Sequence, residues 1–214
     1  MVIGVIAGTP IDTKMGVDYI KENGHKTIGR FCSNSAEEQA HMQIFDPEGL
    51  TEKFIEICNE MVDRGAEGIF VNCNSLSGAI NLNYARKKIL TKIITPLDIY
   101  EKSLNDYKCL SVIASGCKSL ASIEKIILKN NPECMIIGAG ILPLVVAIET
   151  GENSEKIYDD FKIKDLLESF SSMGAEALVL GCTHFPYVME SVKKNLSIPI
   201  INPSDEMLEF LINK

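Results

Sequence analysis

The feature that most constrains this chain is an internal repeat, because its two halves carry the same sequence pattern in the same order. Three matches define the repeat: Val5-Ile6-Ala7 with Val112-Ile113-Ala114, Gly65-Ala66-Glu67 with Gly174-Ala175-Glu176, and Ile93-Ile94-Thr95-Pro96 with Ile200-Ile201-Asn202-Pro203. The offsets all lie between 107 and 109 residues. Since the chain has 214 residues, the repeat predicts two lobes of like fold, each of ordinary domain size.

Within each repeat, short apolar runs alternate with helical patterns. Val2–Ala7 and Gly68–Asn72 have the composition of buried strands, whereas Leu50–Asp63 carries its apolar residues at helical spacing. Such alternation is typical of parallel strands joined by helical crossovers. We therefore predict an α/β fold of two similar lobes, each with a mainly parallel sheet flanked by helices. A pseudo-twofold axis would relate the lobes, with the site between them.

The repeat also predicts the lobe bounds and one thiol for each lobe. Residues 1–96 plus 200–214 are expected to form the N-terminal lobe, and 97–199 the second lobe. Eight residues after the repeated glycine lies a cysteine, Cys73 in the first lobe and Cys182 in the second. Each follows an apolar strand, and ligands of parallel α/β sheets bind beyond the carboxyl ends of the strands. Two facing lobes would therefore present two thiols to one ligand from opposite sides.

Two opposed thiols suit the racemisation of an amino acid. The reaction removes the Cα proton from one face and returns a proton to the other, so it needs a base and an acid on opposite sides. Because a free thiol has a pKa near ~8.5, a small local shift supplies thiolate at neutral pH. The groups that could stabilise charge on the substrate carboxylate follow the two cysteines: Asn74, Ser75 and Ser77, and then Thr183 and His184. The remaining buried-type thiols are interpreted as packing residues: Cys32, Cys58, Cys109 and Cys134.

Composition argues against several other classes of protein. The net charge of −8 disfavours a surface that follows nucleic-acid phosphates, so we expect no nucleic-acid partner. The longest apolar run, 134–148, is shorter than the ~20 residues of a membrane span, so we expect no membrane association. Seven cysteines without a CxxC pair, and no secretory leader, predict reduced thiols in the cytoplasm, with neither disulfides nor a metal site. The glycine motifs of phosphate-binding folds are also missing.

Two motifs around the thiols resemble a known family. The segment Leu180-Gly181-Cys182-Thr183-His184-Phe185-Pro186 is close to the signature around the second catalytic cysteine of glutamate racemases. Val71-Asn72-Cys73-Asn74-Ser75 is similar to the Cys-Asn-Thr motif around the first. From its opening strand to its last helix, the chain thus resembles the aspartate/glutamate racemase family. The resemblance implies catalytic roles for Cys73 and Cys182, a small-molecule amino-acid substrate, no cofactor and often a homodimer.

The resemblance assigns further residues by their place in the motifs. His184 matches the histidine that assists the second thiol, and Glu149 resembles the acid that supports either that thiol or the substrate ammonium. Ser115 resembles the threonine that binds the substrate α-carboxylate, although its loop is one residue shorter than in the family, which leaves Cys117 and Ser119 without a direct match. The expected substrate-binding residues are Gly8, Thr9, Asn74, Ser75, Ser115 and Thr183.

The opening of the chain departs from the glutamate enzymes. They carry an Asp-Ser pair after the first strand, and the Asp serves the first thiol, whereas this chain has Ala7-Gly8 there, followed by Thr9-Pro10. That opening is nearer the Gly-Gly-Met-Gly-Pro of aspartate racemases, which usually have Glu where His184 stands. Asp12 is therefore either a substitute for the missing acid or a turn or helix-cap residue.

These patterns together predict a racemase independent of pyridoxal phosphate that transfers protons at Cα through two thiols, with aspartate or glutamate as substrate. Two alternatives stay open. One is a sister isomerase on the same scaffold, acting on a hydantoin or on maleate, and the form of residues 182–186 counts against it. The other is a non-catalytic binding protein that retains the scaffold, and the missing acid at Ala7 is its best support.

Overall fold

The computed structural model describes residues 1–188, 193, 196 and 198–213, and the chain divides into two compact units. The first unit comprises Met1–Ile99 with Pro203–Lys214, and the second comprises Tyr100–Asn202. The chain crosses between the units after Ile99 and after Asn202, each three residues later than the bounds predicted from the repeat. Strand pairing explains the second crossing, because the short strand β8, Ile200–Ile201, pairs with a strand of the second unit.

The first unit is built on a four-stranded parallel sheet with the strand order β2-β1-β3-β4. Its strands are β1 Val2–Ala7, β2 Lys26–Phe31, β3 Gly68–Val71 and β4 Lys92–Ile94. The helices that connect or follow them are α1 Pro10–Glu22, α2 Ala36–Phe45, α3 Pro47–Asp63, α4 Asn74–Ala79, α5 Leu82–Lys88 and α12 Ser204–Ile212. Helix α6, Pro96–Ser103, carries the chain across the first boundary.

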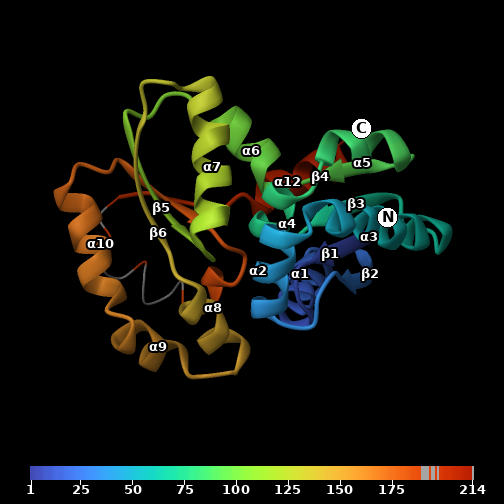
Figure 1. Ribbon diagram of the computed structural model, residues 1–214, viewed down its shortest axis with the longest axis horizontal. Coiled ribbons are helices and arrows are strands. Elements are labelled where there is room, and N and C mark those ends of the chain that lie inside the picture. The colour runs from blue at the N-terminus through green and yellow to red at the C-terminus, as the bar shows by residue number, and fades with distance from the viewer. Residues whose placement is uncertain (189–192, 194–195, 197, 214) are drawn as a thin grey trace. The chain divides into compact units, whose positions relative to one another are not determined.

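The second unit repeats this plan, with the strand order β6-β5-β7-β8 and parallel pairing throughout. Its strands are β5 Cys109–Ala114, β6 Met135–Gly140, β7 Ala177–Gly181 and β8. Its described helices are α7 Cys117–Asn130, α8 Leu142–Glu149, α9 Ser154–Asp160, α10 Ile163–Ser172 and the 3₁₀ turn η1 Phe185–Val188. Figure 1 shows α7 and α10 on opposite sides of this sheet. The prediction of two similar lobes, each with a parallel sheet flanked by helices, is confirmed.

The first sheet is apolar on both faces because successive residues of its strands enter different core clusters. Ile3 and Val5 of β1 pack in one cluster with residues of α1 and α12, whereas Ile6 packs in a second cluster with residues of α3. Side chains alternate across a strand, so continuous apolar runs suit a sheet that is covered by helices on both faces. This is why β1 and β3 were recognisable from sequence, whereas the edge strand β2, with the polar sequence Lys-Thr-Ile-Gly-Arg-Phe, was not.

The long apolar run at 134–148 forms a strand, a turn and a helix. Strand β6 ends at Gly140, and α8 begins two residues later with a proline in its first turn. Proline suits that position because the first helical N–H groups have no partner within the helix. Every helix in the described part of the chain is too short or too polar to span a bilayer.

Gly140 at the end of β6 lets two backbone segments approach each other closely. A Cβ at this position would lie 2.4 Å from the carbonyl carbon of Gly116 and 2.5 Å from the backbone nitrogen of Cys117. Because backbone atoms cannot rotate away, we expect Gly140→Ala to lower the free energy of unfolding by about 1–3 kcal/mol, the usual cost of overpacking. Denaturation by urea measures the change.

Gly116→Ala is the matched control for this prediction, since a Cβ there meets no described atom within 4 Å. The φ angle of Gly116 is −175°, an extended conformation that any residue adopts. Equal losses of stability in the two variants would contradict the role given to Gly140.

Candidate active site

Cys73 stands at the carboxyl end of β3, where the strand turns into α4. The preceding residue, Asn72, still bonds to the sheet through its N–H to the Ile6 carbonyl, at 2.8 Å. Cys73 itself has extended backbone angles and is the N-cap residue of α4. Its sulfur lies 3.3 Å from Ser75 Oγ, and Ser77 Oγ donates to the Cys73 carbonyl at 2.6 Å. The thiol is thus buried and has a hydroxyl partner, and its backbone is fixed by a second one.

The turn after β1 lies beside Cys73, because β1 and β3 are neighbours in the sheet. A Cβ built on Gly8 would be 3.3 Å from the Cys73 sulfur and 3.0 Å from Gln39 Cγ, so the absence of a side chain lets the turn pack closely against both residues. Thr9 is buried and caps α1, since its hydroxyl accepts from the Asp12 N–H at 3.3 Å. The turn therefore brings Gly8 next to Cys73 and gives Thr9 a capping role.

The structure separates the two interpretations that were open for Asp12. The cap of α1 is Thr9, so Asp12 is not the capping residue. Asp12 is almost fully buried, at 1% exposure, and its backbone carbonyl and carboxylate lie 2.9 and 3.3 Å from Asn72 Nδ2. Asn72 precedes Cys73, so Asp12 supports the segment that carries the first thiol.

Asn74 presents unused hydrogen-bonding capacity next to the first thiol. Its side chain is 2% exposed, and neither its Nδ2 nor its Oδ1 has a partner among the described residues. Leaving a buried amide unsatisfied is costly, so such a group is expected to meet a ligand or an ordered water. This observation fits the substrate-binding role predicted for Asn74.

The second unit brings together three of the predicted residues in a chain of polar contacts. Cys182 follows β7, and its sulfur lies 3.5 Å from His184 Nδ1. On the other side of the ring, His184 Nε2 lies 3.0 Å from Glu149 Oε1, at the end of α8. When Nε2 carries the proton and donates to the carboxylate, Nδ1 is left as an acceptor for the thiol proton. The arrangement gives Cys182 a base oriented by an acid.

Two further predicted residues follow strands of the second sheet. Ser115 comes directly after β5 and Thr183 directly after Cys182, and both side chains are half-buried. β5 and β7 are neighbours, so these residues belong to the same edge of the sheet. In the first turn of α7, Ser119 is buried, and its hydroxyl has no partner in the described part of the chain. Ser119 thus adds an available donor near Ser115.

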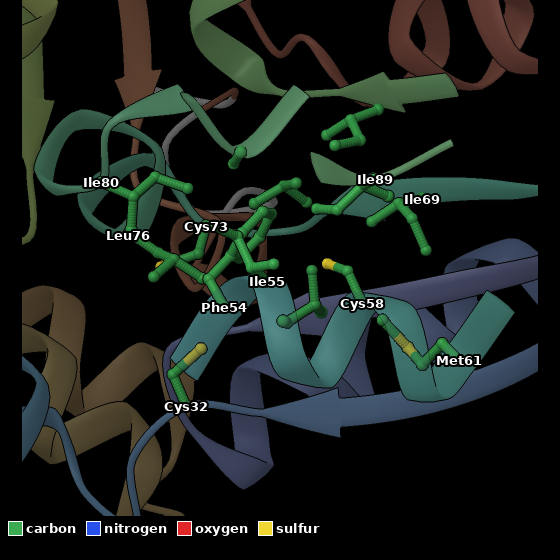
Figure 2. Close-up of a cluster of buried hydrophobic side chains, with 14 of the residues drawn as sticks. Cys32, Phe54, Ile55, Cys58, Met61, Ile69, Cys73, Leu76, Ile80 and Ile89 are labelled. Atoms are coloured by element: carbon green, nitrogen blue, oxygen red, sulfur yellow. The ribbon is translucent and has the colours of Figure 1, made fainter. Parts of the chain in front are cut away.

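The remaining buried thiols differ from the two candidates in their surroundings. Burial raises the pKa of Cys32 to about 12, and it raises the pKa of Cys58 well above its ordinary range. Figure 2 shows both in the apolar cluster that also reaches Cys73. Burial likewise raises the pKa values of Cys109 and Cys134. These four thiols are protonated at neutral pH, which agrees with their interpretation as packing residues.

Sequence patterns did not identify Gln39 or Ser33, which also lie beside Gly8. Gln39 is buried on the inner face of α2, and its Cγ and Cδ lie 3.0 and 3.2 Å from the Cβ position of Gly8. Ser33 follows β2 and donates to the Gly8 carbonyl through its hydroxyl at 2.6 Å and its backbone N–H at 2.8 Å. The sequence signal that could have identified Gln39 is its polar side chain on the helix face that also buries Ala36 and Gln43.

The comparisons with known proteins agree with the motifs. No protein-family model matches the chain. Glutamate racemase from Fusobacterium nucleatum is 28% identical over 168 residues, which is 75% of this chain and 60% of that protein. Glutamate racemase from Francisella tularensis, solved in complex with D-glutamate, superposes with a TM-score of 0.73 at 21% identity, covering 98% of this chain and 80% of that one. Aspartate racemase from Picrophilus torridus gives the same TM-score at 14% identity, covering 99% and 92%.

The chain is similar in sequence to glutamate racemases and has the fold of the aspartate and glutamate racemases.

The chain spans only part of the length of the curated proteins that it matches. It spans 60% of the length of the Fusobacterium enzyme, and its match to glutamate racemase from Limosilactobacillus reuteri, 33% identical over 107 residues, spans 39% of that protein. The similarity to solved racemases covers nearly all of the present chain, so both of its sheets have counterparts in the family fold.

Proposed function

We propose that the protein is an amino-acid racemase that needs no cofactor and uses Cys73 and Cys182 as its two catalytic thiols. The observation that carries the proposal is the equivalent placement of these cysteines. Each ends the third strand of its lobe, β3 or β7, in sheets with the same strand order, and each sulfur has a polar partner. A two-base proton transfer requires two acid–base groups, and the internal repeat supplies one thiol in each lobe.

In the proposed reaction, the thiolate of one cysteine removes the Cα proton of the bound amino acid. The Cα–H bond breaks, an S–H bond forms, and the electron pair is delocalised into the α-carboxylate. The thiol of the other cysteine then donates its proton to the opposite face of Cα and becomes the thiolate. Because the sulfurs exchange states in each turnover, the enzyme must also recover its starting form by proton exchange.

His184 and Glu149 support the second thiol in this proposal. His184 Nδ1 accepts the proton when Cys182 has to act as a thiolate, and the carboxylate of Glu149 stabilises the imidazolium that results. The motif of the first thiol contains no histidine, since Asn74 and Ser75 follow Cys73. The two halves of the reaction are therefore expected to differ in how their thiolates are formed.

We further propose a small acidic amino acid, aspartate or glutamate, as the substrate. The predicted substrate-binding residues offer neutral donors rather than apolar groups: Gly8, Thr9, Asn74, Ser75, Ser115 and Thr183. Hydrogen bonds from neutral donors to a charged carboxylate contribute about 1.5–3 kcal/mol each. Several such bonds can hold two carboxylates and stabilise the charge that develops on one of them during deprotonation.

The test is exchange of the Cα proton for deuterium in D₂O, followed by NMR and by chiral chromatography. The protein is incubated with a panel of L- and D-amino acids, without pyridoxal phosphate and with a chelator. We expect exchange and racemisation with aspartate or glutamate. Exchange with neutral or basic amino acids alone would reject the substrate and keep the mechanism. No exchange with any amino acid would reject the racemase and favour a binding protein.

A further inference from the structure

Gly8 and Gln39 form a contact with Cys73 that neither the motifs nor the proposed catalytic roles explain. At the position of Gly8 the glutamate enzymes carry a side chain, and next to it they carry the acid that serves the first thiol, whereas this chain has Ala7-Gly8. The space beside Gly8 is taken by the Gln39 side chain. The Cβ position of Gly8 lies 3.2 Å from Gln39 Cδ and 3.3 Å from the Cys73 sulfur. The amide of Gln39 and the thiol are therefore close to the same point.

The oxygen of the Gln39 amide faces Ser33. Gln39 Oε1 lies 3.1 Å from Ser33 Oγ, which is itself anchored to the Gly8 carbonyl at 2.6 Å. The other end of the amide, Nε2, is buried and has no partner within the described residues, although Gln39 is only 3% exposed. An N–H donor that is kept buried and unused beside a thiol costs stability unless a charged acceptor appears there during function.

We propose that Gln39 is a positioning residue that donates a hydrogen bond from Nε2 to the thiolate of Cys73. It takes over, from helix α2, the support that the family pattern places after the first strand. The bond stabilises the thiolate when Cys73 is the base. The inference rests on the proposed catalytic role of Cys73, and it concerns one unit of the protein only.

Alkylation by iodoacetamide at neutral pH, followed by peptide mass spectrometry, tests the bond separately from activity. Thiolates react and thiols do not. Gln39→Met keeps the side-chain volume but removes the donor, and we expect it to slow alkylation of Cys73 roughly tenfold or more. The reason is that a hydrogen bond to a charged group shifts the equilibrium between thiol and thiolate by more than about tenfold. Gln39→Glu keeps an oxygen toward Ser33 and replaces the donor with a carboxylate, so it should slow the reaction further.

Two internal references separate this effect from damage to the fold. A loosened core would expose Cys58, which is fully buried in the same cluster, and would speed its alkylation, whereas loss of the donor slows that of Cys73. Gln43→Met is the matched control, since Gln43 is buried one turn further along α2. It should leave the alkylation of both thiols unchanged.

Kinetics with the D- and L-isomers complete the test. We expect Gln39→Met to lower kcat from the isomer that Cys73 deprotonates, with little change in KM. Unchanged or faster alkylation of Cys73 in both Gln39 variants would overturn the inference, and so would an effect on KM alone, which would make Gln39 a substrate-binding residue. If the wild-type protein exchanges no amino acid, the proposed function is rejected. The alkylation rates would still show whether Gln39 stabilises the Cys73 thiolate.

Discussion

Replacing Cys73 or Cys182, the two proposed catalytic cysteines, by serine is expected to reduce racemisation by roughly 10²–10⁴-fold, the usual contribution of a general acid or base. A serine hydroxyl is a far weaker acid than a thiol, so it does not supply the anion at neutral pH. The family pattern suggests that Cys182 takes the proton from the L-isomer and Cys73 from the D-isomer. Each single variant should therefore keep Cα exchange with one isomer only, measured in D₂O by NMR.

The control for this prediction is Cys109→Ala. Cys109 is the first residue of β5, whereas Ser115 follows the last residue of that strand, so the change lies at the far end from the predicted site. Its thiol is protonated at neutral pH, and the variant should racemise as the wild type does. Full racemisation by Cys73→Ser would reject the two-thiol mechanism for this chain.

His184→Asn is expected to have the second largest effect, with a loss of roughly 10²–10⁴-fold in kcat for the isomer that Cys182 deprotonates. The asparagine fills part of the space of the buried imidazole, but its amide is not a base and cannot take the proton of Cys182. Glu149→Gln should lower the same rate, because an amide does not stabilise a neighbouring imidazolium as a carboxylate does. Steady-state kinetics with each isomer measures both effects.

The decisive measurement is whether the losses caused by Glu149→Gln and His184→Asn are additive in the double variant. Glu149 acts through the 3.0 Å contact with His184 Nε2, so adding Glu149→Gln to His184→Asn should cost little more than His184→Asn alone. Glu152→Gln is the matched control, because Glu152 lies three residues further on and pairs with the exposed Lys156. Strictly additive losses would indicate that Glu149 acts on the substrate ammonium instead of on the histidine.

The location of the two thiols depended on local patterns, which is why it could be predicted. Val2–Ala7 and Gly68–Val71 are apolar along their whole length because both faces of the sheet are covered, and this composition marks buried strands without knowledge of their neighbours. The internal repeat then placed Cys73 and Cys182 after equivalent strands. The edge strand β2 could not be predicted in this way, because its partly exposed, polar sequence contains no continuous apolar run.

The supporting contacts could not be read from any local pattern. Glu149 and His184 are 35 positions apart and meet only because α8 and the turn after β7 fold onto the same end of the second sheet. Gln39 lies on a helix whose inner face is partly polar, and its approach to Cys73 exists only because Gly8 has no side chain between them.

By itself, the sequence determined that this protein folds as two α/β lobes with parallel sheets and that a cysteine follows a central strand in each lobe. Periodicity and repetition carry that information, because a strand buried on both faces is constrained residue by residue. Only the tertiary structure decided which side chains stand beside those thiols. Such contacts depend on the packing of helices that are distant in sequence, and many sequences satisfy that packing while placing different groups at the same point.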